Sequence, residues 1–220
     1  MKAKIIRILR KLLCAFNRFP FWNSIRLRGA KLTCKGAALV RCKIDCKGKN
    51  NVIFIEKKAL LTKCKIYIRG DNNVISIGEN VHVKCGEFYI EDAGNRIEIG
   101  NGTSLCGEIH LACTEGTKIQ IGKNCLFSSQ IVFRTGDSHT ILSADGKRIN
   151  FAQDIMIADH VWLGHRVLIN KGVRIEKDSV VGTGSVVTKQ FAESNVVIAG
   201  VPAKIVKKDT NWCGERIGRN

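Results

Sequence analysis

Six branched apolar residues recur at a spacing of six toward the end of the chain. They are Ile157, Leu163, Ile169, Ile175, Val181 and Val187. A helix repeats every 3.6 residues and a strand every two, so neither element alone explains this spacing. A chain wound into a triangular solenoid explains it, because each hexapeptide then forms one short strand and one corner, and three hexapeptides form one coil.

Two further positions of the hexapeptide support this interpretation. The fifth position holds small or β-branched residues: Val161, Val167, Val173, Ser179 and Ser185. The second position holds Ala158, Gly164, Asn170, Glu176 and Gly182. We expect the second positions to form the corners, where φ can turn positive.

A longer repeat lies upstream of the hexapeptides. Ile55, Ile77, Ile99 and Ile121 are 22 residues apart, and each ends a phrase with strand-like alternation, such as NVISIG at 73–78. The intervening runs RGDNN and EDAGN are typical of turns. Each 22-residue unit is predicted to be one coil of three strands with a looser corner. The sequence therefore predicts an all-β parallel solenoid from near Ala38 to Val187.

The repeat is broken at one place. The step from Leu111 to Ile121 is 10 residues, whereas the matching step from Phe133 to Ile157 is 24. The extra residues lie within 134–154, a segment without hexapeptide rhythm that contains Asp137, Ser138 and His139. Long excursions from a rigid scaffold often carry binding and catalytic groups, so this segment is predicted to be an active-site loop.

Positive charge is concentrated at the start of the chain. Of the net +17, residues 1–50 carry 14 Lys or Arg against the single acid Asp45. Residues 1–19 predict an amphipathic helix with apolar residues on one face and cations on the other. Residues 1–37 are thus expected to form a basic helix and a leading segment. Two roles remain open for the helix: it caps the first coil, or it lies on an anionic membrane surface. No motif for nucleic-acid binding accompanies the charge.

Ten cysteines are scattered through the chain without a CxxC pair. Several fall in strand-like phrases: Cys42, Cys64, Cys85 and Cys106. They are interpreted as small buried residues in a reducing cytoplasm rather than as a disulfide framework.

The stretch 157–206, with the phrases HVWLG, VVGTGSVVTK and AGVPAK, resembles the hexapeptide-repeat acetyltransferases. RTGDSHTI and GKRIN upstream resemble the branch that O-acetylates bacterial polysaccharides. The resemblance covers roughly residues 130–207. It implies a left-handed parallel β-helix over 38–207, followed by a tail at 208–220. It also implies acetyl transfer from acetyl-CoA to a sugar hydroxyl of a capsule, O-antigen or exopolysaccharide or its precursor. The implied enzyme is a homotrimer in the cytoplasm, at most at the inner face of its membrane.

The resemblance also suggests catalytic residues. His139 matches the family's catalytic histidine, and an imidazole suits a general base for a weakly nucleophilic hydroxyl. Asp137 is close enough in sequence to orient that imidazole. Trp162 matches a residue that lines the site, although a ring packed on a corner of the coil is an equally ordinary role.

The cofactor residues follow from the same motifs. Thr183, Thr188 and Lys189 match positions near the pantetheine arm and its phosphates, and Lys204 and Lys207 match basic positions near the adenosine end. His165 stands where the family prefers a small residue, so it is expected to reshape the pantetheine groove. No metal is expected.

Three alternatives remain. His160 and His165 have the separation of two zinc ligands in the γ-type carbonic anhydrases, but Asn124 stands near the place of the third, and zinc needs three protein ligands. The two histidines are more simply interpreted as exposed corner residues. A non-enzymatic β-helix that binds a partner is the second alternative. The third is a serine or xenobiotic acetyltransferase of the same fold.

Overall fold

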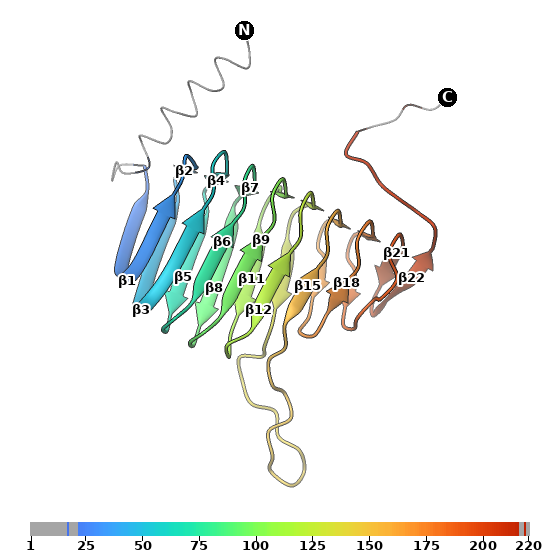
Figure 1. Ribbon diagram of the computed structural model, residues 1–220. Coiled ribbons are helices and arrows are strands. Elements are labelled where there is room, and N and C mark those ends of the chain that lie inside the picture. Colours follow the sequence, from blue (N-terminus) through green and yellow to red (C-terminus); the bar gives the residue numbers. More distant parts are fainter. Residues whose placement is uncertain (1–16, 18–21, 216–217, 219–220) are drawn as a thin grey trace.

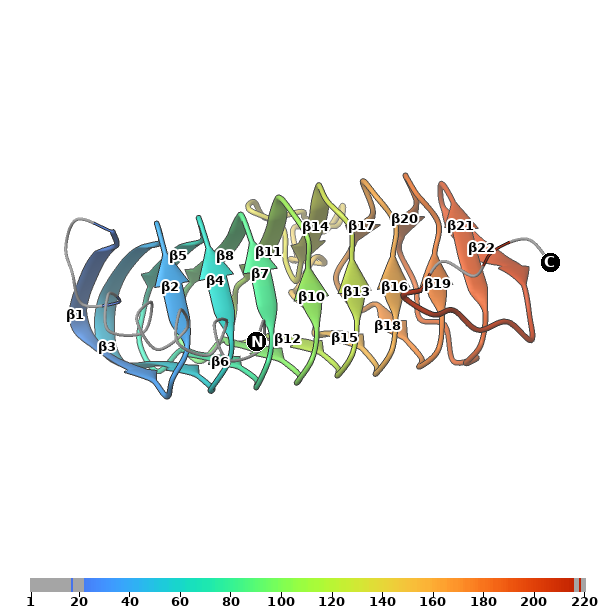
Figure 2. The ribbon, with the colours of Figure 1, turned by 90° about the horizontal axis from the view of Figure 1, so that it is seen from above.

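The computed structural model describes residues 17, 22–215 and 218. Strands and short turns wind there into a straight triangular prism (Figures 1 and 2). This part of the chain contains no helix, and so none that could cross a membrane. The amphipathic helix predicted over 1–19, with its two possible roles, lies outside the described residues apart from Asn17.

The first face of the prism is a nine-stranded sheet, seen from above in Figure 2. Its order is β2 (Ala38–Val40), β4 (Leu60–Thr62), β7 (His82–Lys84), β10 (Ser104–Leu105), β13 (Leu126–Phe127), β16 (Trp162–Leu163), β19 (Val180–Val181), β21 (Val197–Gly200) and β22 (Ala203–Lys207). All neighbours are parallel except the final pair, β21 and β22, which form an antiparallel hairpin.

The other two faces share a 13-stranded sheet. The second face contains β5 (Lys65–Arg69), β8 (Gly86–Glu91), β11 (Ile109–Cys113), β14 (Ile131–Arg134), β17 (Leu168–Ile169) and β20 (Val186–Val187). The third contains β6 (Val74–Ile77), β9 (Arg96–Ile99), β12 (Lys118–Ile121), β15 (Ile155–Ile157) and β18 (Arg174–Ile175). The long strands β1 (Ser24–Cys34) and β3 (Lys43–Ile55) run across both faces, so the parallel ladder begins at Ser24, ahead of the predicted start near Ala38.

The inward side chains confirm both periods. The six residues at spacing six are at most 1% exposed, and the four isoleucines at spacing 22 are at most 3% exposed. Equivalent residues are also register partners on neighbouring coils, as in the pairs Leu163–Val181 and Ile77–Ile99. Burial of each such side chain contributes about 1.5–3 kcal/mol, so this stack is the main source of stability.

The corner prediction was wrong in its position. Positive φ occurs at the fourth residue of the hexapeptide, including His160 (55°), Arg166 (58°) and Gly184 (72°), and not at the second. Gly164 at the second position is small for another reason, the approach of the next coil. A Cβ on Gly164 would lie 2.7 Å from the Thr183 nitrogen, closer than real Cβ contacts.

Buried amides run along the prism where the sequence suggested only turns. Asn51, Asn73 and Asn95 are at most 1% exposed. The backbone N–H of Asn73 donates to Asn51 Oδ1 at 2.9 Å, and the backbone N–H of Asn95 donates to Asn73 Oδ1 at 2.8 Å. Because each side chain satisfies the backbone of the next coil, this ladder keeps the turns in register.

The cysteine prediction holds in part. The nine cysteines that the structure describes are free, and Cys42 and Cys64 are buried. Cys106 is exposed and Cys85 is half-buried, so these two are not core residues as predicted. Cys85 lies at a corner, with φ of 55°.

Replacement of Asn73 by Ala should lower the free energy of unfolding by about 2–4 kcal/mol, because buried backbone groups of the next coil lose their partners. Chemical denaturation measures this loss. Ser76→Ala is the matched control, since Ser76 lies on the outward side of the same coil and should change stability by less than about 0.5 kcal/mol. Equal stability of the Asn73 variant and the wild type would contradict the ladder.

Candidate active site

The predicted loop is the most prominent departure from the prism. β14 ends at Arg134 and β15 starts at Ile155. The excursion (134–154), which runs from the last residue of β14 to the start of β15, projects from the edge between the second and third faces (Figure 1). Its tip is closed by the Ser143 amide nitrogen, which donates to the Lys147 carbonyl at 2.8 Å. The excursion thus lies where the broken period placed it.

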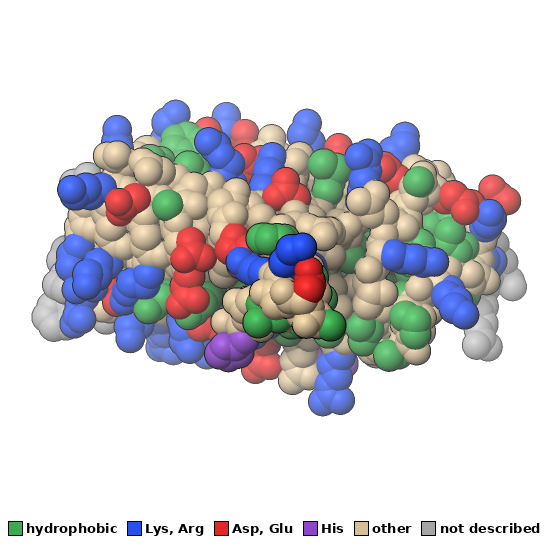
Figure 3. Space-filling model, turned by 90° about the horizontal axis from the view of Figure 1, so that it is seen from below, with side chains coloured by type: hydrophobic (Ala, Val, Ile, Leu, Met, Phe, Trp, Pro, Cys, Tyr) green, Lys and Arg blue, Asp and Glu red, His purple; other side chains and the backbone are tan. Residues whose placement is uncertain are grey.

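The excursion exposes apolar side chains. Ile141, Leu142, Ile149 and Phe151 are between 53% and 60% exposed. Figure 3 views the molecule from the excursion side, with hydrophobic groups on the projecting segment and Lys and Arg side chains over the surrounding surface. Exposed apolar groups in such a cluster commonly mark a contact surface.

Asn150 holds the two limbs of the excursion together. Its Nδ2 donates to the His139 carbonyl at 2.7 Å and to Asp137 Oδ2 at 2.9 Å, and its Oδ1 accepts from the Ile141 amide at 2.8 Å. The side chain is 5% exposed. Since a buried amide with all these partners resists displacement, it fixes the backbone from the His139 carbonyl to the Ile141 amide.

Asp137 is bound to the prism rather than to His139. Its Oδ2 accepts from Lys171 Nζ at 2.6 Å and from Asn150. The hydrogen bond from Lys171, followed by the one from Asn150, lowers the pKa of the Asp137 carboxyl. A depressed carboxyl pKa means that the contact stabilises the fold above the pKa of a free aspartate, and is lost only as the pH falls through the lowered value.

A second ion pair anchors the returning limb. Arg148 pairs with Glu115, which lies in the turn between β11 and β12, and the Ala152 amide donates to the same carboxylate at 3.2 Å. The Arg148 hydrogen bond is the main cause of a lowered pKa for Glu115. The base of the excursion is therefore fixed to the coil at two points.

The His139 imidazole is exposed, and within the described residues it has no hydrogen-bond partner. Its backbone is held while its ring is open to solvent. An imidazole in this state has a free nitrogen available to a hydroxyl that approaches from outside.

Trp162, His165 and Thr183 lie elsewhere on the prism. Trp162 is on β16 of the first face, 40% exposed, with its ring 6.1 Å from that of Trp212 in the tail. His165 and Thr183 are at the edge between the first and second faces, where His165 Nδ1 lies 2.9 Å from Ser129 Oγ. The Gly184 amide donates to the His165 carbonyl at 2.8 Å, so these two residues are stacked on neighbouring coils.

The remaining predicted residues are exposed cations and a threonine. Thr188 and Lys189 follow β20 at the excursion edge, one coil beyond Asn170 and Lys171. Lys189 Nζ lies 5.6 Å from the centre of the Phe191 ring. Lys204 and Lys207 lie on β22 at the end of the solenoid.

Apart from Lys204 and Lys207 at the end of the solenoid, the predicted site residues thus lie at three places within one chain. Asp137, His139, Thr188 and Lys189 lie at the excursion edge. His165 and Thr183 lie at a different edge, and Trp162 lies on the first face. A single chain therefore does not bring the predicted base together with these groups.

The two histidines of the zinc alternative have separate environments. His160 Nδ1 lies 2.9 Å from Asp178 Oδ1, and the ring stacks on Trp212 with centroids 4.3 Å apart. His165 instead contacts Ser129. Among the residues that the structure describes, no group of three or more potential metal ligands comes together.

Relatives with curated names align with about half of the chain. The polysialic acid O-acetyltransferase of Escherichia coli O1:K1 / APEC is 35% identical over 100 residues, 45% of this chain. The galactoside O-acetyltransferase of Escherichia coli K12 is 35% identical over 109 residues, 49% of this chain. The matched regions cover only 32% and 52% of those two proteins. No protein-family model matches the chain.

Solved structures align over nearly the whole chain. The polySia-specific acetyltransferase NeuO superposes with a TM-score of 0.82 and 31% identity, over 90% of this chain and 84% of its own. The polysialic acid O-acetyltransferase OatWY gives 0.83 and 32%, over 90% of this chain and 94% of its own. The chain belongs to the hexapeptide-repeat acetyltransferases.

The residues that hold the excursion in place were missed from the sequence. Asn150 stands in the quoted phrase GKRIN, yet nothing local shows that it bridges Asp137 and the His139 carbonyl. Lys171 is 34 residues from Asp137 and becomes its partner only because the next coil passes beneath the excursion.

Replacement of Asn150 by Ala should loosen the excursion without unfolding the prism. The variant removes the acceptor of the Ile141 amide, and the lost hydrogen bond is worth about 1.4 kcal/mol or more. The rate of amide hydrogen exchange at Ile141 should therefore rise at least tenfold. Hydrogen-exchange mass spectrometry measures the change. Thr140→Ala, an exposed neighbour, is the control. Unchanged exchange in the Asn150 variant would show that other contacts hold the loop.

Proposed function

We propose that this chain transfers an acetyl group from acetyl-CoA to a hydroxyl of a bacterial surface polysaccharide or its precursor. The main support is the superposition on two polysialic acid O-acetyltransferases over 84% and 94% of their length. The fixed backbone and exposed ring of His139 add chemical support. The net charge of +17 suits an anionic acceptor.

His139 acts as the general base. Its free nitrogen takes the proton of the acceptor hydroxyl as that oxygen forms a bond to the acetyl carbon. The carbon–sulfur bond of the thioester breaks, and the imidazole returns the proton to the departing thiolate. The products are an O-acetyl sugar and free CoA, and the histidine ends in its starting state.

Asp137 assists through position. Its carboxylate holds Asn150 and Lys171, and Asn150 in turn holds the His139 carbonyl. These contacts hold the His139 backbone at a fixed position relative to the coil, so Asp137 is a positioning residue in this proposal. A direct bond from Asp137 to the imidazole is not needed.

The exposed lysines suit acetyl-CoA, which supplies the activated acyl group. Lys189, Lys204 and Lys207 make no ion pair within the described chain, so their charges are available to the phosphates of the cofactor. Thr183 and His165 line the open edge near the first face. The residues present therefore fit a long anionic ligand.

A homotrimer would complete the site. The base lies at one edge of the prism, whereas Trp162, His165 and Thr183 lie away from it, so a neighbouring chain has to supply the second set. The exposed apolar groups of the excursion provide a surface for that contact. Analytical ultracentrifugation tests this assembly, and a fully active monomer would contradict it.

His139→Ala should reduce kcat/KM for acetyl transfer by about 10²–10⁴-fold, the usual contribution of a general base. Binding of CoA, followed by calorimetry, should be unchanged. Asp137→Asn should cost less than His139→Ala, because it weakens positioning and leaves the base in place. If the His139→Ala variant keeps near wild-type turnover, another group must act as the general base.

Lys189→Ala and Lys204→Ala should each raise the KM for acetyl-CoA and leave kcat nearly unchanged. Contacts to remote phosphates bind the ground state and the transition state alike. Steady-state kinetics at saturating acceptor measures both constants. Lys147→Ala, at the tip of the excursion, is the control for loss of one surface charge, and unchanged KM values in both variants would refute the cofactor path.

A further inference from the structure

Charge is divided unevenly along the prism. Residues 22–69, which include β1 to β5, contain 13 Lys or Arg and two acids, whereas residues 70–215 contain 15 Lys or Arg and 17 acids. Figure 3 shows Lys and Arg side chains gathered at the end of the prism that carries β1. We call residues 22–69 the cationic end.

The cations of this end surround the prism. The second face and all three edges carry at least one exposed Lys or Arg: Lys43 and Lys65, Arg41 and Lys63, Lys49, and Lys35 and Lys58. Of the 13 cations, only Arg28, Lys57, Lys58 and Arg69 form ion pairs within the described residues. The other charges are therefore available to an anionic partner that meets the end of the prism from any side.

The apolar core is half-open at the same end. Ile25, Leu27 and Leu32 of β1 pack on the core but are only half-buried. Ile44 and Ile53, the register partners of Ile25 and Leu32 on β3, are at most 1% exposed. No strand precedes β1 among the described residues, so the cationic end presents an apolar centre surrounded by positive charge.

Trp22 stands two residues before β1 and is 47% exposed. The neighbouring Asn23 is buried, and its Nδ2 donates to the Leu39 carbonyl at 3.0 Å while its Oδ1 accepts from the Cys42 amide at 2.8 Å. These bonds fix the backbone beside Trp22 against the first coil. An indole ring in such a place suits a membrane–water interface, where Trp is enriched.

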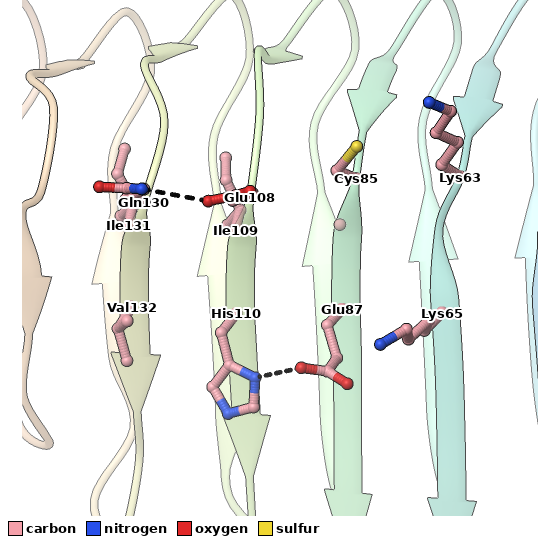
Figure 4. Close-up of a pocket in the computed structure, with 11 residues that line it drawn as sticks. Lys63, Lys65, Cys85, Glu87, Glu108, Ile109, His110, Gln130, Ile131 and Val132 are labelled. Carbon is pink, nitrogen blue, oxygen red and sulfur yellow. Dashed lines mark hydrogen bonds and ion pairs between the residues drawn. The ribbon is translucent and has the colours of Figure 1, made fainter.

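The positive surface ends beyond β5. Lys65 is the register partner of Glu87, and Glu87 is the register partner of His110. Figure 4 shows Lys63 and Lys65 beside one another along the chain, with Glu87 and Glu108 on the next two strands. The cations therefore form a band around one end and do not continue as a track along the face, as a polymer bound lengthwise would require.

We propose that the cationic end docks end-on on a bilayer surface that contains anionic phospholipids. The Lys and Arg side chains reach the headgroup phosphates, and Trp22 and the apolar centre enter the interface. A soluble polyanion would pair with the cations but has no apolar phase for the centre. The inference goes beyond the proposed reaction, because lipid binding needs no acetyl transfer.

End-on docking sets the height of the excursion above the membrane. On the second face, β14 lies five strand spacings from β1, which is about 24 Å. Together with the proposed function, this height places the base beside sugars that extend from the lipid surface rather than beside the headgroups.

The first test measures partition of the full chain into phosphatidylcholine vesicles with and without phosphatidylglycerol, by cosedimentation. The end variant carries three substitutions in β1 and β3: Arg26→Gln, Lys31→Gln and Lys43→Gln. The control variant carries three substitutions of exposed cations on later coils: Arg96→Gln, Lys123→Gln and Lys177→Gln. Even β9, which holds Arg96, is three strand spacings or about 14 Å from β1, beyond the Debye length of about 8 Å at physiological ionic strength.

The wild type and the control variant should bind the anionic vesicles much more tightly than the neutral ones. The end variant should bind the anionic vesicles on the order of 100-fold more weakly, because each cation near an anionic surface contributes about fivefold. Both variants should keep the melting temperature of the wild type, since the replaced side chains are exposed.

The second test measures orientation through the native tryptophans. Trp162 lies on β16, five strand spacings or about 24 Å from β2, and Trp212 lies next to it. Brominated phospholipid should quench the fluorescence of the bound wild type. Trp22→Phe should lose this quenching, whereas Trp162→Phe should keep it.

Three results would overturn the proposal: equal binding of neutral and anionic vesicles, unchanged binding of the end variant, or quenching that survives Trp22→Phe. Unchanged binding of the end variant would assign lipid contact to another part of the chain, such as residues 1–19. Duplex DNA is the comparison polyanion, and DNA binding as tight as vesicle binding, with the same loss in the end variant, would replace the membrane by a general polyanion.

The proposed function is tested separately. Acetyl transfer to a soluble acceptor should be the same in the end variant and the wild type. Vesicle binding without any acetyl transfer would refute the enzyme and retain the docking surface, and acetyl transfer without vesicle binding would do the reverse.

Discussion

The structure depends on register between successive coils. A parallel ladder places each residue above its equivalent one coil away, so an apolar residue is covered by another apolar residue and a buried amide by another polar group. An error of one residue would turn every inward side chain to the surface. The Asn51–Asn73–Asn95 ladder reinforces this register from within, because its amides bind the backbone of the following coil.

The same register allows a long segment to leave the prism at little cost. β14 and β15 resume their ladders on either side of the excursion, with Val132 paired to Leu168 and Gln120 to Met156. The excursion is then tied back by one buried amide and two ion pairs. The proposed base thus has a fixed backbone and an open ring, which is the combination that a proton acceptor for an external hydroxyl requires.

The periodicity predicted the prism and the position of the excursion, because both follow from spacing along the chain. It did not predict the corners correctly. Gly164 is small because of Thr183 on the next coil, and contacts between coils leave no local signature. Asn73 was interpreted as part of a turn, and the turn is real, but its side chain points into the ladder. The partners of Asp137 could not be predicted from the sequence either, because Lys171 comes into contact with Asp137 only after the chain has completed most of another coil. The matched motifs predicted that His139 and Thr183 belong to one active site, whereas the fold of a single chain places these residues at different edges of the prism.

The last hairpin has a consequence for the length of the assembly. A parallel solenoid ends in open strand edges, onto which another copy could add its first coil and extend the prism into a fibre. β22 reverses direction against β21, so the first face does not end in the parallel ladder that the coils repeat. Lys204 and Lys207 also place positive charge along that border. The hairpin therefore disfavours end-to-end growth of the ladder on this face.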